Sequence, residues 1–251
     1  MVIDFPGENR VPELKALWQE AFGEEAFWDG FFQRAFSSDF CRCVILSNAL
    51  AAALCWFDCE WEGRKIAYLY AVATRPDFRG RGLCRALLED VHALLRERGY
   101  AGTMLVPEND ALRNMYAKMG YETCTTVREF MCEAGARAAD LRPVDREEYA
   151  ALRRSLLPDS GVLQEGRNLE LLETMAEFRA GEGALLAAAR EGDTLWVHEL
   201  LGDGQAAPAI VKAMGCTRGR FRTPGREKAF AMFHSLRENR EMPGYFGLAF
   251  D

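Results

Sequence analysis

The sequence lacks any uncharged stretch that approaches the ~20 residues a membrane-spanning helix requires. Its first residues, MVIDFPGENRVPELK, also lack the basic segment followed by an apolar one that marks an export signal. Positive charge is in deficit, because 31 Lys and Arg stand against 38 Asp and Glu and the formal net charge is -7. Such a chain repels a polyanion unless a local basic patch overrides the net charge. These absences predict a soluble cytoplasmic protein with neither a membrane nor a nucleic acid as partner.

Cysteine occurs eight times, but without the spacing of a metal site. Cys41 and Cys43 have one residue between them, whereas zinc ligands are usually two to four residues apart and are joined by a second pair. Small secreted chains need disulfides for stability, and a longer chain without an export signal does not. We therefore expect reduced cysteines and no metal cofactor.

Apolar periodicity predicts a mixed α/β protein. Helices are predicted over Pro12–Phe22, Glu25–Phe36, Leu83–Arg98 and Ala111–Met119. Residues 42–56 and 66–74, joined by a polar turn at Gly63, are predicted to form a β-hairpin or meander, and further strands are predicted over 102–106 and 121–131. This alternation predicts one compact domain over residues 1–133. A segment rich in small residues, 133–140, is predicted to be a linker.

The second half of the chain repeats this order in outline. Residues 141–157 combine a short strand, a turn with a proline and an amphipathic helix. Further along, the sequence predicts a strand over 193–201, a turn over 202–205, a helix over 207–215, and strands over 219–224, 227–236 and 244–251. We interpret residues 140–251 as a second, smaller domain that echoes the first in element order but not in residue identity.

The most informative stretch runs from Tyr70 to Cys84, YAVATRPDFRGRGLC, and places a strand, a glycine-containing turn and a helix start in succession. Such a junction binds anions, because the first N–H groups of a helix have no intrahelical partner and the helix dipole adds positive potential. Gly80 and Gly82 let the backbone approach a diphosphate, and the neighbouring arginines supply charge. The predicted ligand class is a pyrophosphate; the alternative is a basic turn before a surface helix.

Two common phosphate-binding motifs do not fit this turn. The P-loop sequence is absent, and Arg85 occupies the third glycine position of the dinucleotide fingerprint. The order Arg79-x-x-Gly82-x-Cys84 instead resembles the coenzyme A pyrophosphate loop of the GNAT superfamily of acyl-CoA N-acyltransferases, usually Gln/Arg-x-x-Gly-x-Gly/Ala. Cys84 departs from the last position and crowds the loop slightly. The resemblance implies that the pyrophosphate is bound by Arg79, Gly80, Arg81, Gly82, Leu83 and Cys84.

A second stretch, from Asn109 to Tyr121, resembles the other signature of that family. There an Asn begins a helix, a Tyr lies near its end, here Tyr116, and a Gly with an aromatic residue follows. The resemblance covers roughly Pro12 to Met131. It implies a GNAT fold, a mixed central sheet with flanking helices, in which residues 1–133 bind acetyl-CoA. Residues 140–251 are then a degenerate GNAT-like lobe, which forms a wall of the substrate site or a dimer interface. The turn of this lobe over 202–205 carries an acidic residue, which is unsuited to binding a diphosphate.

The resemblance also implies a mechanism. Ala71, Val72 and Ala73 lie along the pantetheine arm, and Asn109 contributes to binding the cofactor. A primary amine attacks the thioester of acetyl-CoA directly in a ternary complex, a backbone N–H stabilises the oxyanion, and Tyr116 protonates the leaving thiolate. The alternative for Tyr116 is packing against the cofactor or the core.

The acceptor and its general base are not indicated by any motif. The acceptor is expected to be a small-molecule or peptide amine, and a homodimer is compatible with the sequence. We expect His92 to be solvated and His198 and His234 to lie in strands. The acidic residues of the hairpin, Asp58, Glu60 and Glu62, are predicted to form a solvated turn, with binding of a cationic substrate as the alternative. The terminal carboxylate of Asp251 is a further candidate for the site. The alternative function is a non-catalytic acyl-CoA-binding sensor or interaction module, which would need no acceptor.

Overall fold

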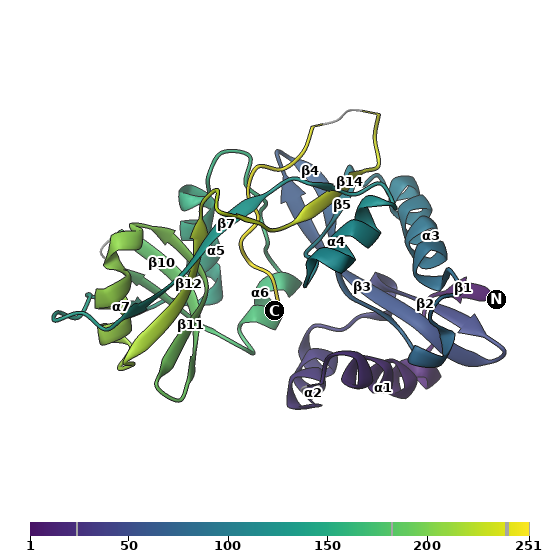
Figure 1. The fold of residues 1–251 in the computed structure, drawn as a ribbon, viewed down its shortest axis with the longest axis horizontal. Helices are drawn as coiled ribbons and strands as arrows, with labels where there is room; N and C mark the ends of the chain where they lie inside the picture. The colour runs from purple at the N-terminus through teal and green to yellow at the C-terminus, as the bar shows by residue number, and fades with distance from the viewer. Residues whose placement is uncertain (24, 182, 239–240, 251) are drawn as a thin grey trace. The chain divides into compact units, whose positions relative to one another are not determined.

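The computed structural model of the protein describes residues 1–23, 25–181, 183–238 and 241–250. The chain forms two compact units, each built on a sheet of its own (Figure 1). Unit 1 comprises Met1–Glu122 and Phe233–Glu241, and unit 2 comprises Thr123–Met232 and Met242–Asp251. The chain therefore enters unit 2, returns to unit 1 and enters unit 2 again, which differs from the predicted division at residues 133–140.

Unit 1 is centred on a seven-stranded mixed sheet in the order β1-β2-β3-β4-β5-β14-β6. The strands from β1 to β4 pair antiparallel with their neighbours, whereas β4 pairs parallel with β5. The mixed sheet confirms the predicted fold class. Its strands are β1 Val2–Asp4, β2 Cys41–Leu46, β3 Ala49–Trp61, β4 Arg64–Thr74, β5 Gly102–Leu105, β6 Glu122–Thr123 and β14 Met232–Ser235.

Four α-helices flank this sheet. They are α1 Val11–Phe22, α2 Glu25–Arg34, α3 Leu83–Glu97 and α4 Asp110–Ala117. Helix α1 packs on β3 and β4, and α3 packs on the strands from β2 to β5. Residues 50–57 of β3 are all buried, as expected for a strand covered on both faces. The helix predictions in this half are confirmed to within a few residues.

The predicted meander over residues 42–74 is confirmed, with one turn more than a hairpin would have. Residues 42–56 form parts of two strands, β2 and β3, because Ser47 and Asn48 make a tight turn between them. Both turn residues have positive φ, 50° and 65°, as a two-residue hairpin turn of type I′ requires. Asn adopts this conformation more readily than most residues, so Asn48 was the missed signal.

Unit 2 contains the other seven-stranded mixed sheet, in the order β13-β7-β12-β11-β10-β9-β8. Strands β11 and β12 are parallel, and the other neighbours pair antiparallel. The strands are β7 Thr126–Glu133, β8 Arg142–Pro143, β9 Glu177–Gly181, β10 Ala184–Glu191, β11 Thr194–Gly202, β12 Arg218–Pro224 and β13 Lys228–Ala229. The helices are α5 Arg146–Leu156, α6 Arg167–Leu172 and α7 Ala207–Ala213.

The predicted linker, 133–140, is confirmed as irregular beyond the end of β7, but it is hydrogen-bonded to helix α7. Gly135 N donates to the carbonyl oxygen of Pro208 at 2.7 Å, and Ala139 N donates to that of Ala209 at 3.0 Å. Behind it, Ile210 and Phe221 belong to the apolar core of unit 2. The linker is therefore part of unit 2 rather than a tether between domains.

Two predicted strands divide where the chain passes between sheets. Residues 121–131 form β6 of one sheet and β7 of the other, and residues 227–236 form β13 and β14 in the same way. At this crossing Phe230 N donates to the Thr125 carbonyl at 2.9 Å, and Cys124 N donates to the Ala231 carbonyl at 3.1 Å. An apolar run carries no signal for a change of sheet, so each was predicted as one strand.

The last predicted strand, over 244–251, was also wrong. Its described residues form a single bridge, Gly161 to Tyr245, and Asp251 lies outside the described residues. The segment is held instead by a buried ion pair. Arg153 donates to both carboxylate oxygens of Glu199 at 2.7 and 3.1 Å, and the Tyr245 hydroxyl donates to the same carboxylate at 3.0 Å.

Candidate functional site

Strand β4 contains a β-bulge at the residues that the sequence placed along a thioester cofactor. Ala53 pairs with Ala73 and Cys55 with Tyr70, so β4 has one residue more than β3 between these pairs. Ala71 in the bulge has a φ of 54°, a left-handed conformation that costs a non-glycine residue about 1–2 kcal/mol. Its carbonyl oxygen accepts a 2.8 Å hydrogen bond from the indole Nε1 of the buried Trp18. Strained backbone held by its surroundings is a common mark of a functional site.

The same part of β4 has a strand on one side only. The parallel pairing with β5 ends at Tyr68 and Met104, while β4 continues to Thr74. Ala71, Val72 and Ala73 therefore lie beyond the end of the β5 partner. Backbone groups along such an edge need a partner other than the sheet, and an extended ligand that contains amides can provide one.

The turn after β4 presents a concentrated set of backbone N–H groups. Gly80 and Gly82 have φ angles of 74° and 75°, and a Cβ placed on either would point into open space. Gly82 begins α3 without a side-chain cap, so the N–H groups of the first helical turn, from Leu83 onward, are directed out of the helix end. The two left-handed glycines and the uncapped helix together form an anion-binding geometry.

Arginine side chains surround this turn. Arg79 and Arg81 are exposed and are each attached to the backbone nearby: Arg79 Nε donates to the Thr74 carbonyl at 3.1 Å, and Arg81 donates to the Asp77 carbonyl at 3.0 Å. Neither arginine forms an ion pair with the described residues. Both charges therefore remain available to an anionic ligand.

Cys84 connects the turn to the second predicted motif. It lies in the first turn of α3, and burial raises the pKa of its thiol to about 11 against the opposing charge of Arg85. The guanidinium of Arg85 donates to the Lys118 carbonyl just beyond α4 at 3.1 Å. Helix α3 thus begins beside the end of α4, and the structure brings Cys84 and Tyr116 together.

Asn109 is the N-cap of helix α4. Its side-chain oxygen accepts from Leu112 N at 3.0 Å, so the amide oxygen satisfies the helix rather than a ligand. The Nδ2 group has no acceptor within the described residues and remains a possible donor to a cofactor. The predicted start of this helix is confirmed by its cap.

Tyr116 lies on the last turn of α4 with 6% of its surface exposed. Burial, with a contribution from Cys84, raises the pKa of its phenol, so the hydroxyl stays protonated at neutral pH. The hydroxyl has no hydrogen-bond partner in the described part of the chain, and its oxygen is not among the fully enclosed polar atoms. A protonated, accessible and unpartnered hydroxyl is suited to donate a proton.

The expected solvation of His92 was wrong, because its side chain is 7% exposed. Its Nε2 lies 2.9 Å from the Tyr121 hydroxyl and 3.2 Å from Thr103 Oγ1, and its ring stacks on His234 at a centroid distance of 4.2 Å. Burial and the charges of His234 and Arg96 lower the pKa of His92 to about 3, which makes it a weak base. The helical wheel placed His92 on the polar face, but β14, which covers that side, was not predicted there.

The acidic cluster of the β3–β4 hairpin does not stand at the site. The Asp58 carboxylate accepts from the Tyr100 hydroxyl and pairs with Lys65 at 2.7 Å, and Glu62 pairs with Arg64 at 3.6 Å. Asp58 and Glu60 lie at the end of β3 and Glu62 in the turn before β4, whereas the bulge lies near the other end of β4. The carboxylates of Asp58 and Glu62 are therefore paired within the hairpin, away from the bulge.

Unit 2 contains the equivalent of the anion-binding turn in a changed form. The Asp203 carboxylate accepts from Gln205 N at 2.8 Å, in the place where unit 1 leaves N–H groups open. Strand β11 also has a bulge, between Val197 and Glu199, but Thr223 Oγ1 donates to the Leu200 carbonyl beyond it at 2.9 Å. The side chains of unit 2 therefore satisfy groups that a cofactor would otherwise bind.

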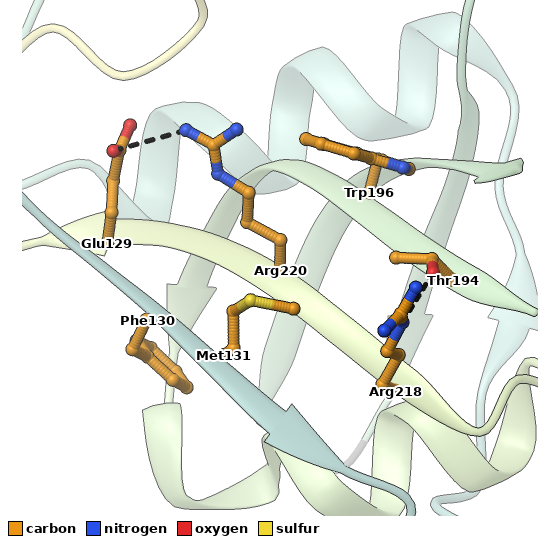
Figure 2. Close-up of a pocket in the computed structure, with 7 residues that line it drawn as sticks. All are labelled: Glu129, Phe130, Met131, Thr194, Trp196, Arg218 and Arg220. Carbon is orange, nitrogen blue, oxygen red and sulfur yellow. Dashed lines mark hydrogen bonds and ion pairs between the residues drawn. The ribbon is translucent and has the colours of Figure 1, made fainter.

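A cavity of about 420 Å³ lies on the sheet of unit 2 (Figure 2). Arg220 lies over the Trp196 ring at 5.1 Å and reaches toward Glu129, and Arg218 donates to Thr194 Oγ1 at 2.9 Å. The cavity is open and shallow between these paired side chains. None of the residues singled out in the sequence for cofactor binding lines it.

Two further properties concern the described residues as a whole. Within them, no three His, Cys, Asp or Glu side chains are grouped so that they could hold a metal ion. No helix in that part of the structure has both the length and the apolar character needed to span a membrane.

Comparison with known proteins agrees with this geometry. Residues 9–121 match the model described as "Acetyltransferase (GNAT) family". An acetyltransferase of Yersinia enterocolitica is 40% identical over 60 residues, and one of Pectobacterium atrosepticum is 38% identical over 68 residues. These matches cover 23% and 26% of this chain and 43% and 48% of the relatives, so they span less than half of the relatives' length.

Solved structures resemble nearly the whole chain. A GCN5-related N-acetyltransferase from Kribbella flavida superposes with a TM-score of 0.68 at 17% identity, covering 94% of this chain and 72% of that one. A GCN5-related N-acetyltransferase from Anabaena variabilis superposes with a TM-score of 0.70 at 14% identity, covering 94% of this chain and 73% of that one. A putative acetyltransferase from Pyrococcus horikoshii gives 0.68 at 14% identity, covering 93% and 89%. At this level of identity the likeness establishes the fold of both units.

The bulged and open strand, the left-handed glycine turn and the helix that carries Tyr116 all fall within or directly beside the matched segment. Residues 9–121 therefore match the GNAT acetyltransferase family, and the chain as a whole has the fold of solved GCN5-related N-acetyltransferases.

Proposed function

We propose that this protein is an N-acetyltransferase that moves the acetyl group of acetyl-CoA to a primary amine by direct attack in a ternary complex. The observation that carries the proposal is that unit 1 combines the bulge at Ala71, the left-handed turn at Gly80 and Gly82, and the protonated hydroxyl of Tyr116. Each of these parts has one chemical task in such a reaction.

Binding of coenzyme A is assigned to the open strand and to the turn. The pantetheine amides pair with the exposed edge of β4 along Ala71, Val72 and Ala73. The diphosphate takes the N–H groups of the uncapped first turn of α3, and Arg79 and Arg81 neutralise its charge. The Cys84 thiol, with its raised pKa, is neutral and small, and it is compatible with an anion at this helix end.

Acyl transfer then needs an oxyanion donor and an acid. The nitrogen of the neutral amine forms a bond to the thioester carbonyl carbon and then loses one proton to solvent. The carbon–sulfur bond breaks as the tetrahedral intermediate collapses. We assign the oxyanion hole to a backbone N–H at the bulge. Tyr116 gives its proton to the departing thiolate and is reprotonated from solvent.

The acceptor is proposed to be a small-molecule or peptide amine. We propose that the amine arrives neutral or loses its proton to solvent. His92 is excluded as an effective base by its low pKa, of about 3. We also propose that the protein is cytoplasmic and forms a homodimer. Unit 2 is proposed to form a wall of the acceptor site.

The test is release of free thiol from acetyl-CoA across a panel of small amines and peptides. The blank is an Arg79→Ala, Gly82→Glu double variant, which removes one positive charge from the turn and adds a negative one. We expect turnover with at least one acceptor class in the wild type and none in the blank. Failure of wild-type acetyl-CoA binding, measured by calorimetry, would refute the proposal.

The competing function is an acyl-CoA-binding sensor or interaction module without turnover. It would retain the turn and the open strand but would have no use for a protonated phenol beside Cys84. Acetyl-CoA binding with no thiol release on any amine would favour this alternative.

A further inference from the structure

The end of helix α4 is a Schellman motif, and Tyr116 is one of its residues. Tyr121 N donates to the Tyr116 carbonyl at 3.2 Å, and Gly120 N donates to the Ala117 carbonyl at 3.1 Å. Gly120 adopts the left-handed conformation that the motif requires, with a φ of 87°. The motif usually brings the two residues at its ends into contact, and here the rings of Tyr116 and Tyr121 meet edge to face at 5.8 Å.

This turn is held by a residue that lies 114 positions later in the sequence. His234 Nδ1 is 2.9 Å from the carbonyl oxygen of Gly120. A carbonyl oxygen only accepts, so His234 carries its proton on Nδ1 and donates it to the turn. The approach is close, because a Cβ on Gly120 would stand 3.1 Å from the His234 ring.

His234 comes from strand β14, which lies beside β5 (Figure 1) and has β6 as its other neighbour in the sheet of unit 1. The chain supplies this strand only after it has formed the strands and helices of unit 2. The turn that ends the helix of Tyr116 is therefore bordered by a strand from a distant part of the sequence.

The other end of the same turn is fixed by Tyr121. Its hydroxyl lies 2.8 Å from Thr103 Oγ1 and 2.9 Å from His92 Nε2, and all three side chains are buried. The His92 ring is stacked on His234 with an interplanar angle of 6°. The aromatic surface on which Tyr116 rests is thus held by polar contacts at both ends.

We propose that His234 is a positioning residue for Tyr116, acting through its hydrogen bond to the Gly120 carbonyl. The proposal rests on the role of Tyr116 in the proposed acyl transfer. Strand β14 would then complete the sheet and also hold the turn after α4 in place. Without that contact, the Tyr116 phenol would lose its alignment with the leaving sulfur. Misplacement of a catalytic group by about 1 Å can cost as much as 100-fold in rate.

Two substitutions at His234 separate its hydrogen bond from its packing. His234→Phe keeps a ring to stack on His92 and removes the donor. His234→Asn keeps an N–H donor near the position of Nδ1 and removes the ring. We expect His234→Phe to lower kcat about 10-fold or more with an unchanged KM for acetyl-CoA, and His234→Asn to restore most of it. His198→Phe, the same change on strand β11 of unit 2, is the matched control and should leave kcat unchanged.

A double-mutant cycle tests whether the effect passes through Tyr116. In a Tyr116→Phe background, His234→Phe should cost no further activity, because no hydroxyl remains to be positioned. If His234→Phe lowers activity equally in the wild-type and Tyr116→Phe backgrounds, the proposal is overturned. It is also overturned if His234→Asn is no more active than His234→Phe while both variants melt at the wild-type temperature.

A readout without turnover keeps the test independent of the proposed function. In protein labelled with ¹³C at the tyrosine Cζ, the resonance of Tyr116 is identified among the seven tyrosines by its loss in Tyr116→Phe. We expect His234→Phe to shift or broaden this resonance, and His234→Asn and His198→Phe to leave it in place. If no amine is acetylated but the resonance responds as stated, the acyl-transfer proposal fails and the positioning contact stands; an unchanged resonance in His234→Phe overturns the contact itself.

Discussion

Replacing Tyr116 by Phe removes one oxygen atom and leaves the buried ring in place. The hydroxyl has no partner in the described part of the chain, so its removal leaves no donor or acceptor unsatisfied. The ring keeps its contact with Tyr121. The free energy of unfolding should therefore change by less than about 0.5 kcal/mol, the usual range for substitutions that neither open a cavity nor leave a polar group unsatisfied.

Activity should respond very differently. General acid catalysis contributes on the order of 10²–10⁴ in rate. At about 1.36 kcal/mol per factor of ten, the loss corresponds to roughly 3–5 kcal/mol of transition-state stabilisation. The affinity for acetyl-CoA should be unaffected, because the turn and β4 provide its binding groups.

The assay is thiol release at saturating acetyl-CoA and amine, with calorimetric titration of acetyl-CoA as the control. Because the pKa of Tyr116 is raised, the acid form persists above the ordinary phenol value, and wild-type turnover should show no alkaline decline from this group below pH ~10. A Tyr116→Phe turnover number within threefold of the wild type would refute the assigned role. A decline of wild-type turnover that begins below pH ~10 and is absent in Tyr116→Phe would also refute it.

Three other predictions concern stability, each measured by denaturant unfolding. Gly82→Ala should lower the free energy of unfolding by about 1–2 kcal/mol from conformation alone, since its φ is 75° and its Cβ would meet open space; no change would indicate that the turn relaxes. Glu199→Gln should cost about 3–5 kcal/mol because it leaves the buried Arg153 charge uncompensated, whereas an Arg153→Met, Glu199→Leu double variant should cost much less. The pKa of His92 is lowered to about 3 in the folded chain, so below about pH 6.5 this histidine is protonated in the unfolded chain and not in the folded one. The free energy of unfolding should therefore fall between pH 7 and 5, by at most about 1.4 kcal/mol per pH unit. The variant His92→Gln should make this pH dependence weaker.

Much of unit 1 could be predicted because its signals are local. The periodicity of α3 and the glycines around it fix a helix and its two ends, and Asn109 marks the start of α4 as a cap. Glycine turns and helix starts depend on neighbours in sequence. For this reason the positions of the glycine turn and of the helix that follows it were predicted correctly, while anion binding there stays a prediction.

What could not be predicted depends on residues distant in sequence. Trp18 has the spacing of a core residue, and its hydrogen bond to the Ala71 carbonyl requires knowing that α1 lies on β4. His92 seemed solvated because the strand that covers it follows more than half of the chain later. The bulge itself is visible only from the register of two strands.

The crossing of the chain between the two sheets has a consequence for synthesis. While the ribosome is still producing the second half, the first sheet lacks the strand between β5 and β6, and its neighbours expose unpaired edges. Unit 1 is thus finished only after residues 232–235 have emerged, late in translation. A fragment cut after residue 133 would leave that gap permanently and would carry β7 without its partners β12 and β13. The smallest piece of this protein that can fold to its final form therefore includes most of the second half.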